Sequence, residues 1–118
     1  MSVTNLYTYR GEIRGLASAG GNLAFVTVHE EGKSTALYRI DIEKGTMAIS
    51  ELPCGGQALA LAEDSHIYIA GTDGKIYHRG WDEDAFALLA ELPAPAVALT
   101  VVGGGRLAAL CGDTLVLV

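Results

Sequence analysis

The sequence predicts an all-β fold built from short antiparallel strands, and three observations support this prediction. Apolar residues come in short runs separated by clusters of Gly, Asp, Asn and Ser, which is the pattern of strands joined by tight turns. The tripeptide Glu-Leu-Pro at 51–53 returns at 91–93, so the chain carries an internal repeat with an offset of 40 residues. No helix of ordinary length fits, because flanking Gly and Pro residues leave the alanine-rich stretches only about five to seven positions.

Eleven strands follow from the positions of the turns. Dipeptides such as Lys44-Gly45 and Asp73-Gly74 mark hairpins, because these residues tolerate positive φ. The first repeat spans 13–52, the second 57–92 and the third 97–118, where the chain stops without an outer strand. The expected strands are 13–19, 23–29, 35–41 and 47–52, then 57–62, 66–70, 75–80 and 86–92, and finally 97–102, 107–111 and 114–118.

The missing outer strand of the third repeat is expected at the beginning of the chain. Residues 3–10 hold an otherwise unassigned apolar stretch with Leu6, Tyr7 and Tyr9. Tyr9 stands seven residues before Leu16, and the same spacing separates the equivalent residues of the next two repeats, Leu52 from Leu59 and Leu92 from Leu99. We therefore expect one domain over residues 1–118, with three four-stranded units, the last of which is completed by strand 3–10.

Four-stranded repeats of about 40 residues are typical of β-propellers, and two segments carry a closer resemblance. Residues 69–79, Ile-Ala-Gly-Thr-Asp-Gly-Lys-Ile-Tyr-His-Arg, resemble the hairpin between the second and third strands of WD40-like blades. Residues 37–45, Leu-Tyr-Arg-Ile-Asp-Ile-Glu-Lys-Gly, are similar to the third strand and turn of YVTN-like blades. This resemblance implies three blades in one chain. Alanines such as Ala58 and Ala60 gather in the first strand of each repeat, which suits the crowded centre of a propeller.

Three blades are too few to close a ring, because closed propellers have about 4 to 8. Such a chain would expose apolar faces on both end blades and an unpaired strand edge. Two copies supply six blades, so we expect a homodimer that closes as a six-bladed ring. Leu6, Tyr7 and Tyr9 of each copy would then form the outer strand of the partner's third blade. Closure of that blade within one chain, and a chain that is a fragment of a longer propeller protein, remain alternatives.

Charge and hydropathy argue against several kinds of partner. The chain has 14 acidic and 8 basic residues and a net charge of −6, which would repel a phosphate backbone, so no nucleic acid is expected. No apolar run reaches the roughly 20 residues that cross a bilayer, and the first residues lack the pattern of a secretion signal. We therefore expect no membrane contact and a cytoplasmic location, where Cys54 and Cys111 stay reduced.

No motif in the sequence points to catalysis. His29, His66 and His78 lack the spacing of metal ligands. The Gly-rich run at 103–105 is not followed by the Lys-Ser or Lys-Thr of a phosphate loop, so neither a metal nor a cofactor is expected. A nucleophilic Cys54 would need a lowered pKa. We expect a protein without enzymatic activity.

The resemblance to WD40-like scaffolds implies a protein-interaction platform, as part of a larger complex. Loops carry binding residues more often than strands do, so charged loop residues are the expected contacts. These residues are Arg10, Arg14, Glu30, Glu31, Asp73 and Asp113. The alternative is a carbohydrate or other small ligand bound between blades, as in lectins assembled from short propeller chains, which would require an aromatic platform in every blade.

Overall fold

The computed structural model describes residues 2, 3, 5, 7–18, 22–52, 54–62, 66–80, 83 and 85–118. These residues form three antiparallel sheets. The first contains β1 (Glu12–Ser18), β2 (Leu23–His29), β3 (Ala36–Asp41) and β4 (Thr46–Glu51). The second contains β5 (Ala58–Ala62), β6 (His66–Ala70), β7 (Lys75–Gly80) and β8 (Ala87–Glu91). The third contains β9 (Ala96–Val102), β10 (Arg106–Cys111) and β11 (Thr114–Leu117), with the 3-10 turn η1 (Gly103–Gly105) between β9 and β10.

The all-β prediction is confirmed, and the eleven strands expected from residue 13 onward each begin and end within one residue of their expected positions. The described residues of the expected strand 3–10 form no strand in the single chain. Consecutive strands pair in chain order in every sheet, so each sheet is a meander. The residues in the turns explain why the strand boundaries could be predicted. Gly45 and Gly74 have φ values of 68° and 80°, and the carboxylates of Asp41 and Asp73 accept hydrogen bonds from the backbone of Lys44 and Lys75.

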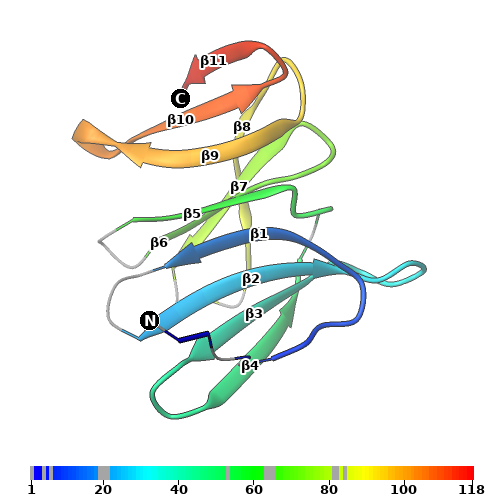
Figure 1. The fold of residues 1–118 in the computed structure, drawn as a ribbon. Coiled ribbons are helices and arrows are strands. Elements are labelled where there is room, and N and C mark those ends of the chain that lie inside the picture. Colours follow the sequence, from blue (N-terminus) through cyan, green and yellow to red (C-terminus); the bar gives the residue numbers. More distant parts are fainter. Residues whose placement is uncertain are drawn as a thin grey trace.

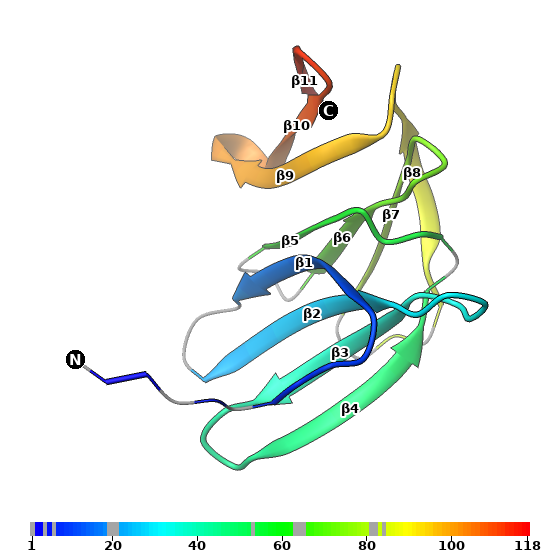
Figure 2. The same ribbon diagram turned by 45° about the vertical axis from the view of Figure 1, so that its right-hand side comes forward.

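The three sheets are stacked, and the stack is open at both ends (Figure 1). The first strands β1, β5 and β9 follow one another along the stack, and each contacts the next across the junction between sheets. The view in Figure 2 shows the outer strands β4 and β8 on the other side of the stack. Among the described residues the third sheet has three strands, and nothing pairs with the outer edge of β11. This open arrangement of blade-like sheets is compatible with a propeller.

Two different cores join the sheets. The first and second sheets meet through large side chains, namely Phe25, Leu37, Leu52, Leu59, Ile67 and Ile69. The second and third sheets meet through small ones, namely Ala58, Ala70, Ala96, Ala109 and Cys111. Small residues on the first strands allow close approach, as expected from the sequence. A Cβ on Gly15 of β1 would lie 2.8 Å from Thr27 Oγ1 and 3.2 Å from Leu59 Cβ.

No helix that could cross a membrane is found in the part of the chain that the structure describes.

Truncation of Leu37, which is 1% exposed in the first core, tests this packing. We expect Leu37→Ala to lower the free energy of unfolding by about 2–5 kcal/mol, because it leaves a cavity between two sheets. Urea unfolding followed by circular dichroism, at one protein concentration, measures the change. The control is Leu88→Ala on β8, where the side chain is 53% exposed and a change below about 1 kcal/mol is expected. Equal losses for both variants would contradict the assigned core.

Candidate functional site

The charged residues expected to contact a partner lie on one side of the stack (Figure 1). Glu30 and Glu31 follow β2, Asp73 lies between β6 and β7, and Asp113 lies between β10 and β11. Arg10 precedes β1. Arg10, Glu31, Asp73 and Asp113 are exposed. The side of the stack that carries these turns is called the loop side below.

Two of the expected contact residues, Arg14 and Glu30, form ion pairs within the chain. Arg14, near the start of β1, donates from Nη1 to the carbonyl oxygen of Gly55 at 2.9 Å, and its Nε lies 3.4 Å from Glu12 Oε1. Arg14 therefore ties the first sheet to the segment that leads into the second. Glu30 Oε2 lies 3.0 Å from Lys33 Nζ, an ion pair within the turn between β2 and β3.

A buried polar junction on the loop side joins the first two sheets. The carbonyl of Gly55 accepts hydrogen bonds from Arg14 and from Thr35 Oγ1 at 3.3 Å, and the next carbonyl, Gly56, accepts one from Thr27 Oγ1 at 3.1 Å. Thr27 and Thr35 are buried. Three side chains of the first sheet thus satisfy two successive carbonyls just before β5.

This junction was not expected from the sequence. Its one signal was the pair Gly55-Gly56, since adjacent glycines mark a place where backbone passes close to other groups. The structure shows why position 55 is glycine, because a Cβ on Gly55 would collide with the side chain of Thr72. Gly56 has a φ of 58°, in the left-handed region.

Cys54, the one thiol considered as a nucleophile, is half-buried beside this junction. Burial raises the pKa of the Cys54 thiol, which opposes formation of a thiolate. The neighbouring carboxylate of Asp73 accepts a hydrogen bond of 2.6 Å from the hydroxyl of Tyr77. This hydrogen bond stabilises the neutral phenol and raises the pKa of Tyr77 to about 12.

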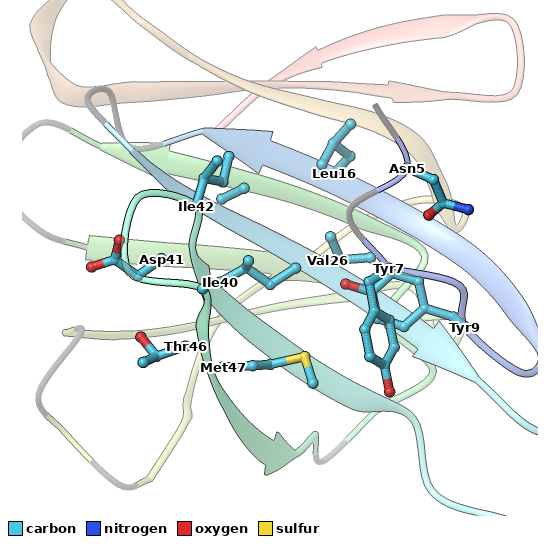
Figure 3. A pocket seen from close by; sticks show the side chains of 12 residues that line it. Asn5, Tyr7, Tyr9, Leu16, Val26, Ile40, Asp41, Ile42, Thr46 and Met47 are labelled. Carbon is cyan, nitrogen blue, oxygen red and sulfur yellow. The ribbon is translucent and has the colours of Figure 1, made fainter. Parts of the chain in front are cut away.

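The outer face of the first sheet, which points away from the second sheet, is apolar and hollowed (Figure 3). The hollow has a volume of about 580 Å³. Its floor includes Leu16, Val26 and Met47, and Tyr7 and Tyr9 stand at its side. We call it the β1–β3 hollow. Leu16 is 74% exposed, so a large apolar side chain on the innermost strand has no cover.

Tyr7 and Tyr9, two of the residues expected in the closing strand, lie on this face in the single chain. The Tyr9 ring centroid is 4.7 Å from that of Tyr7 and 4.9 Å from that of Tyr38 on β3. Leu6, the third expected residue, lies outside the described residues. The Tyr9 hydroxyl oxygen is buried and has no hydrogen-bond partner among the described residues, and burial raises its pKa.

The outer face of the third sheet is the other end of the stack, and it is apolar too. Exposed large side chains on this sheet are Val97, Val102, Leu110, Leu115 and Leu117. Leu115 on β11 is 74% exposed. Each end of the stack thus presents a sheet face that the described residues cover less fully than they cover the two internal junctions.

One histidine pair lies on the second sheet. His66 Nε2 and His78 Nδ1, on neighbouring strands, are 2.9 Å apart, and the ring of Tyr68 lies nearly parallel to that of His78. Over the described ranges no group of three or more His, Cys, Asp or Glu residues is placed to hold a metal ion.

No protein-family model matches this sequence, and no curated protein sequence matches it. Solved structures share its arrangement of sheets. A chain of hydrazine synthase from Kuenenia stuttgartiensis is similar with a TM-score of 0.73 at 10% identity, over 94% of this chain and 34% of that one. The computationally designed Ika4 protein is similar with a TM-score of 0.51 at 14% identity, over 100% of this chain and 98% of that one.

These likenesses concern the fold alone, because identities of 10% and 14% carry no information about activity. The chain spans about a third of the length of the hydrazine synthase chain that it matches. The fold is compatible with propeller blades, while the WD40-like character expected from residues 69–79 stays a prediction.

The polar junction can be tested by removal of one hydroxyl. We expect Thr27→Val to lower the free energy of unfolding by about 1–3 kcal/mol, because it leaves the buried carbonyl of Gly56 without its partner at little change in volume. Urea unfolding measures the loss. Thr114→Val removes an exposed hydroxyl from the first residue of β11 and is expected to change stability by less than about 0.5 kcal/mol. A loss no larger for Thr27→Val than for this control would contradict the junction.

The Asp73–Tyr77 hydrogen bond predicts that the alkaline titration of Tyr77 changes when Asp73 is replaced. Asp73→Asn removes the carboxylate that holds the proton on the phenol, so the pKa of Tyr77 should fall from about 12 toward 10. Because the folded pKa is raised above the unfolded value, the stability that this bond contributes is complete below pH 10 and is lost as the pH rises through 12. Difference absorbance of wild type and variant during an alkaline titration isolates the phenolate of Tyr77. Superimposable curves would count against the bond.

Proposed function

We propose that this chain is a non-enzymatic protein-interaction scaffold that acts as a homodimer, in which two copies close as one six-bladed ring. The observation that carries the proposal is the contrast between the ends and the middle of the stack. At the two internal junctions, Leu37 in the first core and Ala109 in the second are 1% and 0% exposed. At the two ends, Leu16 and Leu115 are each 74% exposed.

Uncovered apolar sheet faces favour association. Burial of apolar surface contributes about 25 cal/mol per Å², and a standard interface buries roughly 800 Å² per partner. The two end faces belong to opposite faces of blade-like sheets, so a second copy can cover both at once. Two copies give six sheets, within the range of about 4 to 8 in which propellers close.

The open edge of β11 supports strand exchange between the copies. In each of the first two units, the residue that follows the fourth strand donates its N–H to the carbonyl oxygen of the residue just before the third strand. Leu52 N donates to Thr35 O at 2.9 Å, and Leu92 N donates to Gly74 O at 2.8 Å. Tyr9 and Asp113 hold the equivalent positions for the third sheet. The proposed strand 3–10 therefore places Tyr9 N against Asp113 O of the partner subunit.

The loop side is the proposed docking surface for another protein. It carries exposed charges of both signs, including Arg10, Glu31 and Asp113, on turns held by rigid sheets. The raised pKa of Cys54 supports a role without covalent catalysis. Tyr38 and Tyr77 hold equivalent positions on the third strands, but Val116 holds the same position in the third sheet, which disfavours the lectin alternative.

The proposed ring predicts that the full chain has the mass of a dimer and that removal of the closing strand weakens this dimer. Size-exclusion chromatography with light scattering should give twice 12.3 kDa for the full chain. A variant that lacks residues 1–10 has no closing strand, so its dimer should dissociate at a protein concentration at least about tenfold higher than wild type does, equivalent to about 1.4 kcal/mol. A variant that lacks only residues 1 and 2 is the control and should match wild type. A monomeric full chain would refute the ring, and an equally stable truncated dimer would refute strand exchange.

If the loop side docks another protein, a charge reversal there should weaken the binding of that protein, and a charge reversal on the opposite side should not. Glu31→Lys changes the loop side, whereas Glu43→Lys changes an exposed turn between β3 and β4 on the opposite side. In affinity capture from cells that express the protein, partners retained by wild type should be lost with Glu31→Lys and kept with Glu43→Lys, while both variants remain dimeric. If both reversals retain the same partners, the loop side is not the docking surface.

A further inference from the structure

The sheets of this chain repeat position by position, and the repetition indicates what covers each end face. Cross-strand pairing defines a triplet of neighbours on the face that points along the stack toward the C-terminal end. The three triplets are Gly15–Thr27–Leu37, Ala58–Ala70–Ile76 and Ala98–Leu110–Leu115. Leu37 and Ile76 are 1% and 0% exposed, and Leu37 packs against Leu59 and Ile69 of the next sheet, whereas Leu115 is 74% exposed.

The opposite faces carry a second set of equivalent triplets. These are Leu16–Val26–Tyr38, Leu59–Ile69–Tyr77 and Leu99–Ala109–Val116. Leu59 and Ile69 are 6% and 0% exposed in the core against the first sheet. Leu16, the first-sheet equivalent of Leu59, is the residue left exposed. Each set therefore has one uncovered member, Leu115 of the third sheet in the first set and Leu16 of the first sheet in the second.

The internal core shows which side chains meet at such a junction. Leu37 packs in one cluster with Leu59 and Ile69 of the next sheet and with Leu52 from the connection between them. By position, a third junction would bring Leu115 against the counterparts of these residues. Leu16 replaces Leu59, Val26 replaces Ile69 and Tyr9 replaces Leu52. Leu16, Val26 and Tyr9 all line the β1–β3 hollow.

We propose that the β1–β3 hollow is the seat of Leu115 from a second copy of this chain, so that the outer face of β9–β11 packs on the outer face of β1–β3. This inference rests on the ring proposed above and adds its contact surface and register. The two faces differ, so the contact is heterologous and is complete only when the ring closes. The exposed Leu110 beside Leu115 extends the same apolar surface.

A close contact inside the chain sets the register of the proposed interface. Gly15 lies against Leu59, since a Cβ built on Gly15 falls 3.2 Å from Leu59 Cβ. Ala98 is the counterpart of Gly15, and Leu16 is the counterpart of Leu59. The interface should therefore place Ala98 of one copy beside Leu16 of the other, near the Cβ separation of about 3.8 Å found in disulfides.

Cysteine cross-linking of the full chain tests this register. The variant Leu16→Cys with Ala98→Cys should form a disulfide-linked dimer under mild oxidation, with at least about tenfold more product than either single variant. The control pair Leu88→Cys with Ala98→Cys joins an exposed β8 position that lies on neither end face, and it should give no more product than wild type, whose own two thiols set the background. Non-reducing gel electrophoresis measures the product.

A charge introduced at the exposed Leu115 also tests the proposed interface. Leu115→Asp should shift dimer dissociation to at least about tenfold higher protein concentration, because the carboxylate would enter the apolar hollow, whereas Leu88→Asp should leave dissociation unchanged. A dimeric wild type without the 16–98 cross-link, or a dimer that tolerates Leu115→Asp, would overturn this interface and leave the ring proposal standing. A monomeric wild type would overturn both.

Discussion

The structure depends on one constraint, that an apolar sheet face must be covered by another sheet. A four-stranded meander alone leaves its apolar faces in contact with water, which is unfavourable. In this chain the second sheet satisfies the constraint for both neighbours, with large side chains toward the first sheet and small ones toward the third. The first strands β1, β5 and β9 lie against one another from sheet to sheet, so small residues on them allow the sheets to approach closely.

The same constraint applies at the two ends of the stack, where apolar sheet faces are exposed. The first and third sheets each have one face covered within the chain and one left with exposed Leu, Val and Ile side chains. Tyr7 and Tyr9 cover part of the first face through contact with Tyr38, yet the Tyr9 hydroxyl remains buried without a described partner. Buried polar groups in native proteins are nearly always paired, so this arrangement fits a segment that has a better place elsewhere. The proposed strand exchange offers that place.

Turn chemistry made the strands predictable, and the 40-residue offset made the three units predictable. The polar junction was not predictable, because Arg14 and Gly55 stand 41 residues apart and Thr27 and Gly56 stand 29 apart. No local pattern records a side chain that binds a distant carbonyl. For the same reason Arg14 was expected among the partner contacts, although its guanidinium holds two sheets together. The position of Tyr9 against Tyr38 depends on which copy supplies its neighbours, and the residues of one chain do not determine that.

The open edge of β11 shows whether a second copy pairs with this chain. Val118 N and Leu107 O form a hydrogen bond toward β10, so by strand alternation the N–H groups of Leu115 and Leu117 point to the open edge. Hydrogen exchange followed by NMR at these two amides reports whether another strand pairs there. If two copies complete each other, both amides exchange as slowly as those in the middle of the sheets. Exchange at the rate of an unpaired chain would contradict the account.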